Sequence, residues 1–331
     1  MERFPLADPS QIGAARREAV RIAAECGMPE EDRARLAIVV TELSTNTIRH
    51  GGGGEMLIGR RATDDCPSLE AIWSDKGPGM VDPEACLRDG YSSKGTSGTG
   101  FGAAVRLSDG FDCYSRAGQG TVVLARLRAG RAPAAVAGDW QVGAVAVPKS
   151  GEPVSGDAWA VRQDGTLLCC MVVDGLGHGP QAAEAAAAAV DQFESAPACD
   201  AVAIIERVHA GMRATRGGAV AVACVDRSRR TVAYCGVGNI AGAVAGTGLR
   251  RMVSLNGTAG GVASRIRSFD YAFEAGAAIL LHSDGLSASW STAPYPGLMA
   301  HDPTVIAGVL FRDQERGRDD ATILVVREQP A

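Results

Sequence analysis

The chain has 331 residues, of which 33 are Lys or Arg and 38 are Asp or Glu, so its formal net charge is −5. This length suggests about two domains, and an acidic chain without a block of Lys and Arg is not expected to bind nucleic acid. No apolar run reaches the ~18–20 residues of a membrane-spanning helix, and the start, Met1–Pro5, lacks the apolar core of a signal peptide. We therefore expect a cytoplasmic protein that does not enter a membrane.

The first 128 residues show two helical patterns followed mainly by strands. Gly27 ends the first helix, and Pro29 opens the second, with acidic residues in its first turn. Helices are expected over 9–26, 29–50 and 83–88 and from about Gly100, and strands near 55–61, 69–75, 110–116 and 120–128. The stretch 129–138 is small, contains Pro and Gly, has no periodicity and is interpreted as a linker.

Residues 139–331 show strands, two helices, more strands, one helix and a last strand. Strands are expected near 139–147, 157–163, 166–174, 217–226, 231–239, 265–275, 277–283 and 321–327, and helices near 180–195, 199–214 and 302–315. This order is typical of a sandwich in which two sheets are covered by helices on both sides. The nine cysteines include no C-x-x-C pair; reduced thiols are expected, with Cys169 and Cys170 as small buried residues of a strand.

The second predicted helix carries a polar stripe. Glu42, Asn46 and His50 recur every four residues and therefore share one helical face. The stripe could be only the solvated side of the helix. Alternatively, Asn46 supplies an oxygen ligand to Mg²⁺, and Glu42, one turn earlier, orients or deprotonates a nucleophile.

Two glycine-bearing segments follow. Asp75 comes directly after a predicted strand and could accept a hydrogen bond from an adenine amino group, while Gly77 and Gly79 let the chain turn closely around the base; a plain turn is the alternative. Farther along, three alternating glycines open a helix, where exposed backbone N–H groups favour phosphate; they are Gly98, Gly100 and Gly102.

In this order, the three segments make the first ~128 residues resemble the GHKL ATPase/kinase superfamily, in particular the RsbT/RsbW-type serine kinases that phosphorylate STAS-domain regulators. Further likeness to the RsbT type lies in Gly51–Gly54, in Asp89–Ser92 and in Asp109–Phe111. The resemblance implies a GHKL (Bergerat) α/β sandwich that binds ATP with Mg²⁺, with Asn46 as the magnesium ligand, Glu42 as the catalytic carboxylate and Asp75 as the adenine contact. Thr99 and Phe101 stand where the family usually has leucines.

Four separated acidic residues mark the C-terminal part: Asp157, Asp174, Asp284 and Asp319. Asp174 and Asp284 each end an apolar run and precede a glycine, which leaves a carboxylate at a sheet edge with free approach. A carboxylate set without Cys or His ligands favours Mg²⁺ or Mn²⁺, and two such ions can activate a water and polarise a phosphoryl group. The alternative for any single Asp-Gly pair is an ordinary turn.

These residues resemble the metal-dependent serine/threonine phosphatases of the SpoIIE-like bacterial branch, over about residues 138–328. The segment Asp174–Gly179 is the sharpest mark and points to the RsbX type. The resemblance implies an α-β-β-α sandwich that binds two Mn²⁺ or Mg²⁺ ions through the four carboxylates, with the Gly175 carbonyl completing one site; Asp320 could exchange roles with Asp319. Asp174 is thereby part of the catalytic centre.

Three further residues near these motifs leave alternatives open. His178 could be a general acid to the leaving oxygen, or could only hydrogen-bond its loop. Lys149 could meet the substrate phosphate, or could belong to a solvated turn. Asn239 lies in a strand-end motif and would at most approach the metals.

The expected protein is α+β: a GHKL domain over 1–128, a linker over 129–138 and a phosphatase domain over 139–331. The expected function is bifunctional control of bacterial partner switching. The phosphatase would dephosphorylate phosphoserine or phosphothreonine on a STAS-domain protein, and the ATP-binding domain would phosphorylate or dock the same partner. The alternative is a phosphatase whose N-terminal domain is a docking module without turnover. The oligomeric state is left open.

Overall fold

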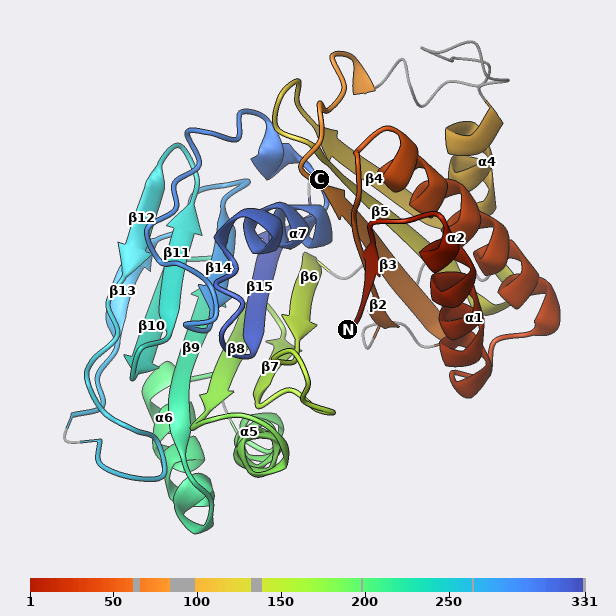
Figure 1. Cartoon of the computed structure of the whole chain (residues 1–331). Coiled ribbons are helices and arrows are strands. Elements are labelled where there is room, and N and C mark those ends of the chain that lie inside the picture. The colour runs from red at the N-terminus through yellow and green to blue at the C-terminus, as the bar shows by residue number, and fades with distance from the viewer. Residues whose placement is uncertain (62–65, 84–98, 132–138, 198, 264, 330–331) are drawn as a thin grey trace. The chain divides into compact units, whose positions relative to one another are not determined.

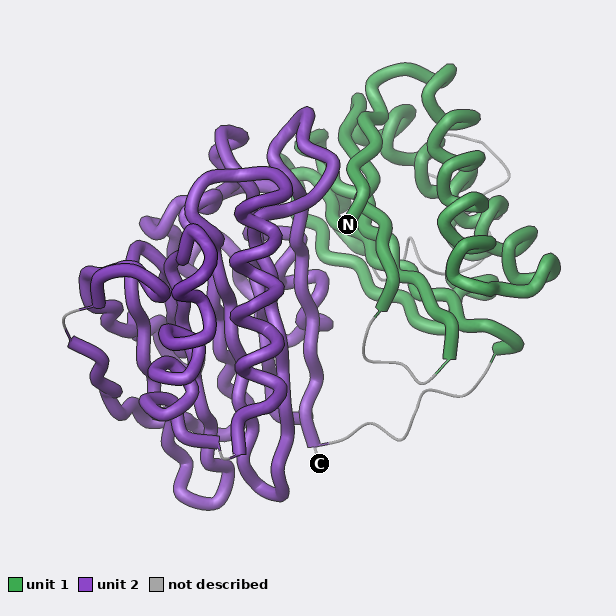
Figure 2. Tube along the Cα trace, turned by 90° about the horizontal axis from the view of Figure 1, so that it is seen from below, with its two compact units in different colours: residues 1–137 green, residues 138–331 purple. Residues whose placement is uncertain are grey.

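The computed structural model describes residues 1–61, 66–83, 99–131, 139–197, 199–263 and 265–329. The chain divides into two compact units, Met1–Ala137 and Gly138–Ala331 (Figure 2). Much of the predicted linker 129–138 and of the predicted helix 83–88 lies outside the described residues. None of the described helices combines the length and the apolar character that a membrane span requires.

The N-terminal unit is one antiparallel sheet with helices packed on it (Figure 1). The strand order is β1-β2-β3-β5-β4. The strands are β1 (Glu2–Leu6), β2 (Gly54–Arg60), β3 (Ser68–Asp75), β4 (Gly110–Ser115) and β5 (Thr121–Arg128), and the helices are α1 (Ser10–Glu25), α2 (Glu30–Arg49) and α4 (Thr99–Leu107). The sequence analysis did not predict β1, whose backbone pairs with β2 from Glu2↔Ile58 to Leu6↔Gly54.

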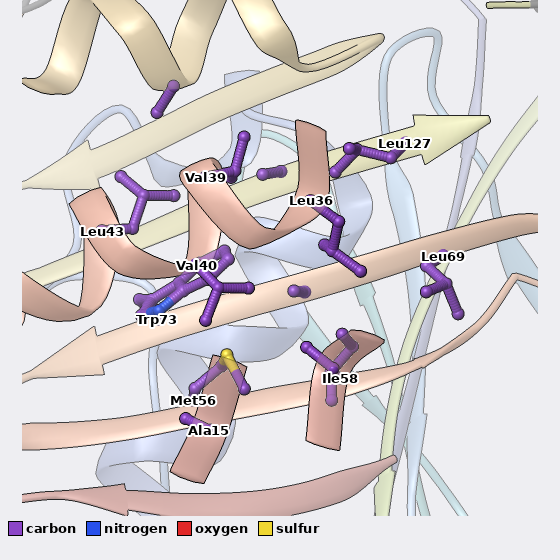
Figure 3. Packing of buried hydrophobic residues seen from close by; sticks show 14 of the residues in the cluster. Ala15, Leu36, Val39, Val40, Leu43, Met56, Ile58, Leu69, Trp73 and Leu127 are labelled. Carbon is purple, nitrogen blue, oxygen red and sulfur yellow. The ribbon is translucent and has the colours of Figure 1, made fainter. Parts of the chain in front are cut away.

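The core of this unit lies between α2 and the sheet. Leu36, Val39, Val40 and Leu43 recur at helical spacing and are fully buried. Figure 3 shows Val40 beside Trp73 of β3, whose indole Nε1 donates a 3.0 Å hydrogen bond to Ser44 Oγ. The apolar stripe thus holds one face of α2 on the sheet and leaves the Glu42–Asn46 face beside it.

The C-terminal unit stacks two five-stranded sheets, and every neighbouring pair of strands is antiparallel. One has the order β13-β10-β9-β8-β7 and the other β12-β11-β14-β15-β6. The strands are β6 (Trp140–Val147), β7 (Asp157–Asp164), β8 (Leu167–Gly175), β9 (Gly218–Asp226), β10 (Thr231–Val237), β11 (Ala241–Ala245), β12 (Leu249–Met252), β13 (Phe269–Ala272), β14 (Ala278–His282) and β15 (Ala321–Glu328).

Helices cover the outer faces of the sandwich. α5 (Pro180–Glu194) and α6 (Ala201–Gly211) pack on the first sheet, and α7 (Pro303–Gln314) packs on β6 and β15 of the second. Asp200 and Asp302 cap α6 and α7 by accepting hydrogen bonds from Ala203 N and Thr304 N. The α-β-β-α sandwich expected from the sequence is confirmed, although β11 and β12 were not predicted as separate strands.

One pair of cysteines forms a disulfide, contrary to the expectation of reduced thiols. Cys169 of β8 and Cys224 of β9 face each other in register and form a disulfide, with their Cα atoms 4.2 Å apart. Such a short Cα separation is typical of facing residues on adjacent antiparallel strands. Because the two cysteines lie 55 positions apart in the sequence, no local pattern indicated this pairing. Cys170, the next residue, is buried with a free thiol, as expected.

Candidate functional site

Both sheets of the C-terminal unit contribute carboxylates to one end of the sandwich. Asp157 begins β7 and is the register partner of Asp174 near the end of β8. In the second sheet, Asp284 follows β14 and Asp319 precedes β15, and these two strands are antiparallel neighbours, so the end of one meets the start of the other. The two-sheet stack therefore gathers residues that are up to 162 positions apart.

A buried serine joins the two halves of this cluster. Ser283 Oγ, from the second sheet, donates a 2.6 Å hydrogen bond to Asp157 Oδ2 of the first sheet and accepts one from Thr322 N at 3.0 Å. Ser283 is fully buried. The sequence analysis assigned Ser283 no role; its position directly before the predicted ligand Asp284 was the only available signal.

The electrostatics of the cluster indicate a deficit of positive charge. Burial, opposed by the Ser283 hydrogen bond and reinforced by Asp320 and Asp319, raises the pKa of Asp157 to about 7. Burial and then the charges of Asp157, Asp284 and Asp319 raise the pKa of Asp174 to about 8. Burial and Asp319 also raise the pKa of Asp284. Carboxylates that repel one another in this way are held ionised only by a cation or a donor.

The structure separates the roles of the neighbouring Asp319 and Asp320. Asp320 is buried, and its two oxygens accept hydrogen bonds from Lys149 N at 2.8 Å and Gly156 N at 2.9 Å. Asp319 is only partly buried, and its Oδ1 accepts from Asp320 N. Asp320 therefore holds the loop before Asp157 in place, while Asp319 retains oxygen capacity for an ion.

Two loops bring additional polar groups to the same end. The exposed Asn239 donates from Nδ2 to Asp284 Oδ2. Gly175 N donates to Gly156 O at 3.0 Å, which ties the turn after β8 to the loop before β7. Within the described ranges, the acidic side chains do not converge into a finished ligand set of three or more.

His178 lies in the loop after β8 and has a carboxylate partner that the sequence analysis did not assign. Its Nδ1 lies 2.6 Å from Oε1 of Glu152, in the loop before β7. Glu152 also approaches Gly179, since a Cβ on Gly179 would lie 2.6 Å from Glu152 Oε2. The contact spans 26 positions, so no local pattern could indicate it.

In the N-terminal unit, the fold brings the second predicted motif against the end of α2. Asp75 is the last residue of β3, and its Oδ1 accepts a 2.9 Å hydrogen bond from Gly77 N. A Cβ on Gly51 would lie 2.6 Å from Asp75 Cγ, and one on Gly77 would lie 2.4 Å from Gly51 O. Gly51 N also donates to Asn46 O at 3.3 Å. The Asp75 turn and the last turns of α2 are therefore in direct contact.

The structure describes all of the other predicted ATP-site residues except Gly98. Glu42 and Asn46 are partly buried and one turn apart on α2. Gly79 has a φ of +64°, and a Cβ there would lie 1.9 Å from Arg116 O, so only glycine fits. Gly100 and Gly102 lie in the first turn of α4, as expected, whereas Gly98 lies outside the described residues.

Comparison with known proteins matches two separate stretches of the chain to two different families. Residues 6–127 match the family described as "Histidine kinase-like ATPase domain", and residues 164–295 match "Stage II sporulation protein E (SpoIIE)". The serine/threonine-protein kinase RsbT of Bacillus subtilis (strain 168) is 35% identical over 114 residues, which are 34% of this chain and 86% of RsbT. The phosphoserine phosphatase RsbX of the same organism is 30% identical over 141 residues, 42% of this chain and 71% of RsbX.

A solved structure supports the fold of the C-terminal part. It is described as "The bacterial stressosome: a modular system that has been adapted to control secondary messenger signaling", and it is similar with a TM-score of 0.53 and 27% identity, covering 57% of this chain and 100% of that chain. The chain thus combines members of two families: its N-terminal part belongs to the histidine kinase-like ATPase domains of the RsbT type, and its C-terminal part belongs to the SpoIIE-type serine/threonine phosphatases that include RsbX.

Proposed function

We propose that this protein is a bifunctional regulator of partner switching. Its C-terminal domain removes phosphate from phosphoserine or phosphothreonine of a STAS-domain protein, and its N-terminal domain binds ATP with Mg²⁺ and phosphorylates or docks the same partner. The observation that carries the proposal is the carboxylate cluster at the end of the sandwich, where burial and mutual repulsion raise the pKa values of Asp157 and Asp174.

The residues of the cluster fit two hard divalent ions. The donors are carboxylate oxygens, which Mg²⁺ and Mn²⁺ prefer, and their raised pKa values reflect charge that a cation would neutralise. Asp157, Asp174, Asp284 and Asp319 are the proposed ligands, together with the Gly175 carbonyl. When bound, the ions supply positive charge to the phosphoryl group and a nucleophilic water.

The protein's own groups orient the centre and handle the proton. Ser283 aims Asp157 through its 2.6 Å hydrogen bond, and Asp320 holds the loop that precedes it. The Glu152 carboxylate fixes one nitrogen of His178, which leaves Nε2 to give a proton to the departing serine or threonine oxygen. A carboxylate partner of this kind sets the tautomer and the orientation of an imidazole.

In the N-terminal domain, the contact of the Asp75 turn with α2 supports a nucleotide site. Asp75 would bind the adenine amino group, Asn46 would hold Mg²⁺, and Glu42 would act on the hydroxyl that receives phosphate. The glycines at the start of α4 would present backbone N–H groups to the phosphates. If Glu42 provides no turnover, the same site would serve as an ATP-dependent docking module.

The phosphatase is tested by hydrolysis of p-nitrophenyl phosphate by the full chain with Mn²⁺, Mg²⁺ or EDTA. We expect activity that needs a divalent ion, that is lost in Asp174→Asn and that is kept in Asp164→Asn. Asp164 is a suitable control because it lies at the opposite, exposed end of the same β7–β8 hairpin. Equal activity in EDTA, or an active Asp174→Asn variant, would refute the proposed metal centre.

The kinase is tested by transfer of labelled γ-phosphate from ATP to candidate STAS-domain proteins. The Asp174→Asn background removes the opposing phosphatase. Transfer that disappears in Glu42→Gln, with ATP binding retained, would support the kinase. ATP binding without transfer to any partner would instead favour the docking module.

A further inference from the structure

One arginine beside the turn that follows Asp174 has no role in the proposed function so far. Arg216 lies between α6 and β9, directly before Gly217 and Gly218. Gly218 is the register partner of Gly175, and Leu176 N donates a 2.9 Å hydrogen bond to Gly217 O. The backbone next to Arg216 is therefore hydrogen-bonded to the strand end and turn that contain Asp174 and Gly175.

The guanidinium reaches over this turn. Nη1 of Arg216 lies 3.1 Å from the position that a Cβ would take on Gly177, two residues after Gly175. A larger residue than glycine at position 177 would displace the arginine. The charged group thus lies above the loop that joins the predicted metal ligand to His178.

The backbone around Arg216 is held in place from both sides. Thr215 Oγ1 donates to Met212 O at 2.7 Å and accepts from Gly217 N at 3.1 Å. Gly217 has a φ of +73°, and a Cβ there would lie 2.3 Å from Ala259 O, so this turn requires glycine. Gly218 and Ala259 exchange two backbone hydrogen bonds of 3.0 and 2.8 Å. A fixed backbone limits the positions that the arginine can sample.

Among the residues that the structure describes, none takes up the charge of Arg216. Arg216 is exposed, and among the described residues it forms no hydrogen bond, ion pair or ring contact. The nearby Arg316 differs, because its charge already acts on Asp284. Lys149, the other basic candidate, donates a hydrogen bond to Asp320 Oδ1 through its backbone N–H and not through its ammonium group.

We infer that Arg216 binds the phosphoryl group of the substrate at the phosphatase centre and positions it over the carboxylate cluster. The inference rests on the proposed phosphatase function. A guanidinium presents paired N–H donors that match two phosphate oxygens, whereas an ammonium acts as a point charge. Arg216 therefore binds the substrate directly, sets the position of the phosphorus atom and adds positive charge at a site whose side-chain ligands are all anionic.

The test compares Arg216→Gln, Arg216→Lys and the control Arg213→Gln in the full chain with Mn²⁺. Arg213 is an exposed arginine three residues earlier that takes no part in the proposed site. For p-nitrophenyl phosphate, we expect Arg216→Gln to raise KM about tenfold, the loss of one charge-assisted contact, and to lower kcat by less. The inhibition constant of inorganic phosphate should rise by a similar factor, with Arg216→Lys intermediate and Arg213→Gln unchanged.

A second readout does not depend on turnover. Inorganic phosphate should raise the melting temperature of the Mn²⁺-loaded wild type, and this rise should be smaller in Arg216→Gln. An inactive wild type that still shows the Arg216-dependent phosphate effect would refute the phosphatase function but support the role of Arg216. Unchanged KM and phosphate inhibition in Arg216→Gln, equal effects in Arg213→Gln, or the lack of any phosphate effect in the wild type would overturn the inference.

Discussion

Neutralising Asp174 should stabilise the metal-free protein although it abolishes activity. The folded-state pKa of Asp174 is raised from 3.8 to about 8 because the carboxyl is partly buried and faces other carboxylates. Between these values the folded state binds more protons than the unfolded state, so stability is highest at low pH and is lost as pH rises toward 8. Asp174→Asn removes the ionisable group from this balance.

The size of the expected stabilisation follows from the shift in the pKa of Asp174. One pKa unit corresponds to about 1.4 kcal/mol, so the full shift of an isolated carboxyl would cost about 5 kcal/mol at pH 8. Asp174 is only partly buried and shares its proton equilibrium with Asp157, so we expect about 2 kcal/mol. For a unit of this size, that corresponds to a melting temperature about 4–8 °C above that of the wild type in EDTA at pH 8.

The assay is calorimetry of the full chain in EDTA between pH 5 and pH 8, following the transition that Mn²⁺ raises in the wild type. The wild-type melting temperature should fall across this range, and that of Asp174→Asn should fall less. Adding Mn²⁺ at pH 8 should reverse the order, because the variant lacks a ligand. Asp164→Asn should behave as the wild type. A wild-type melting temperature that does not fall with pH in EDTA, or an Asp174→Asn variant that melts below the wild type there, would refute the reasoning.

Three further predictions concern the N-terminal core, the ATP site and the general acid. Arg35 is buried among Asp32, Asp109 and two backbone carbonyls. Arg35→Met should therefore lower the free energy of unfolding in urea by about 3 kcal/mol, because it leaves two carboxylates without their ion-pair partner. The substitution Arg21→Met, at an exposed arginine, should leave the urea midpoint unchanged. Gly51→Ala places a Cβ against Asp75 and Thr47 and should weaken binding of an ATP analogue about tenfold or more. The control Gly13→Ala in α1 should not weaken it. Equal affinity of the two variants for the analogue would contradict the proposed adenine site. Glu152→Gln should lower kcat about tenfold for a phosphoserine peptide, whose leaving group needs a proton, and much less for p-nitrophenyl phosphate, whose leaving group does not; a uniform loss on both substrates would count against the Glu152–His178 acid.

Local patterns in the sequence were sufficient to predict most helices and strands and to nominate the residues of the proposed sites. The helical spacing of Leu36, Val39, Val40 and Leu43 predicted which face of α2 is buried, and so left Glu42 and Asn46 beside it. Apolar runs that stop at Asp174 and before Asp284 predicted carboxylates at strand ends. Such signals are legible because side-chain periodicity repeats within a few residues.

The pairing of strands, the loops that join them and the stacking of the sheets decided what the sequence left open. They placed Ser283 against Asp157, Glu152 against His178 and Arg216 over Gly177, and they turned Asp320 toward two backbone N–H groups and so distinguished it from Asp319. They likewise paired β1 with β2 and Cys169 with Cys224. These contacts join residues that lie from 26 to 171 positions apart, and a contact at that range depends on strand register and sheet packing, which no local pattern encodes.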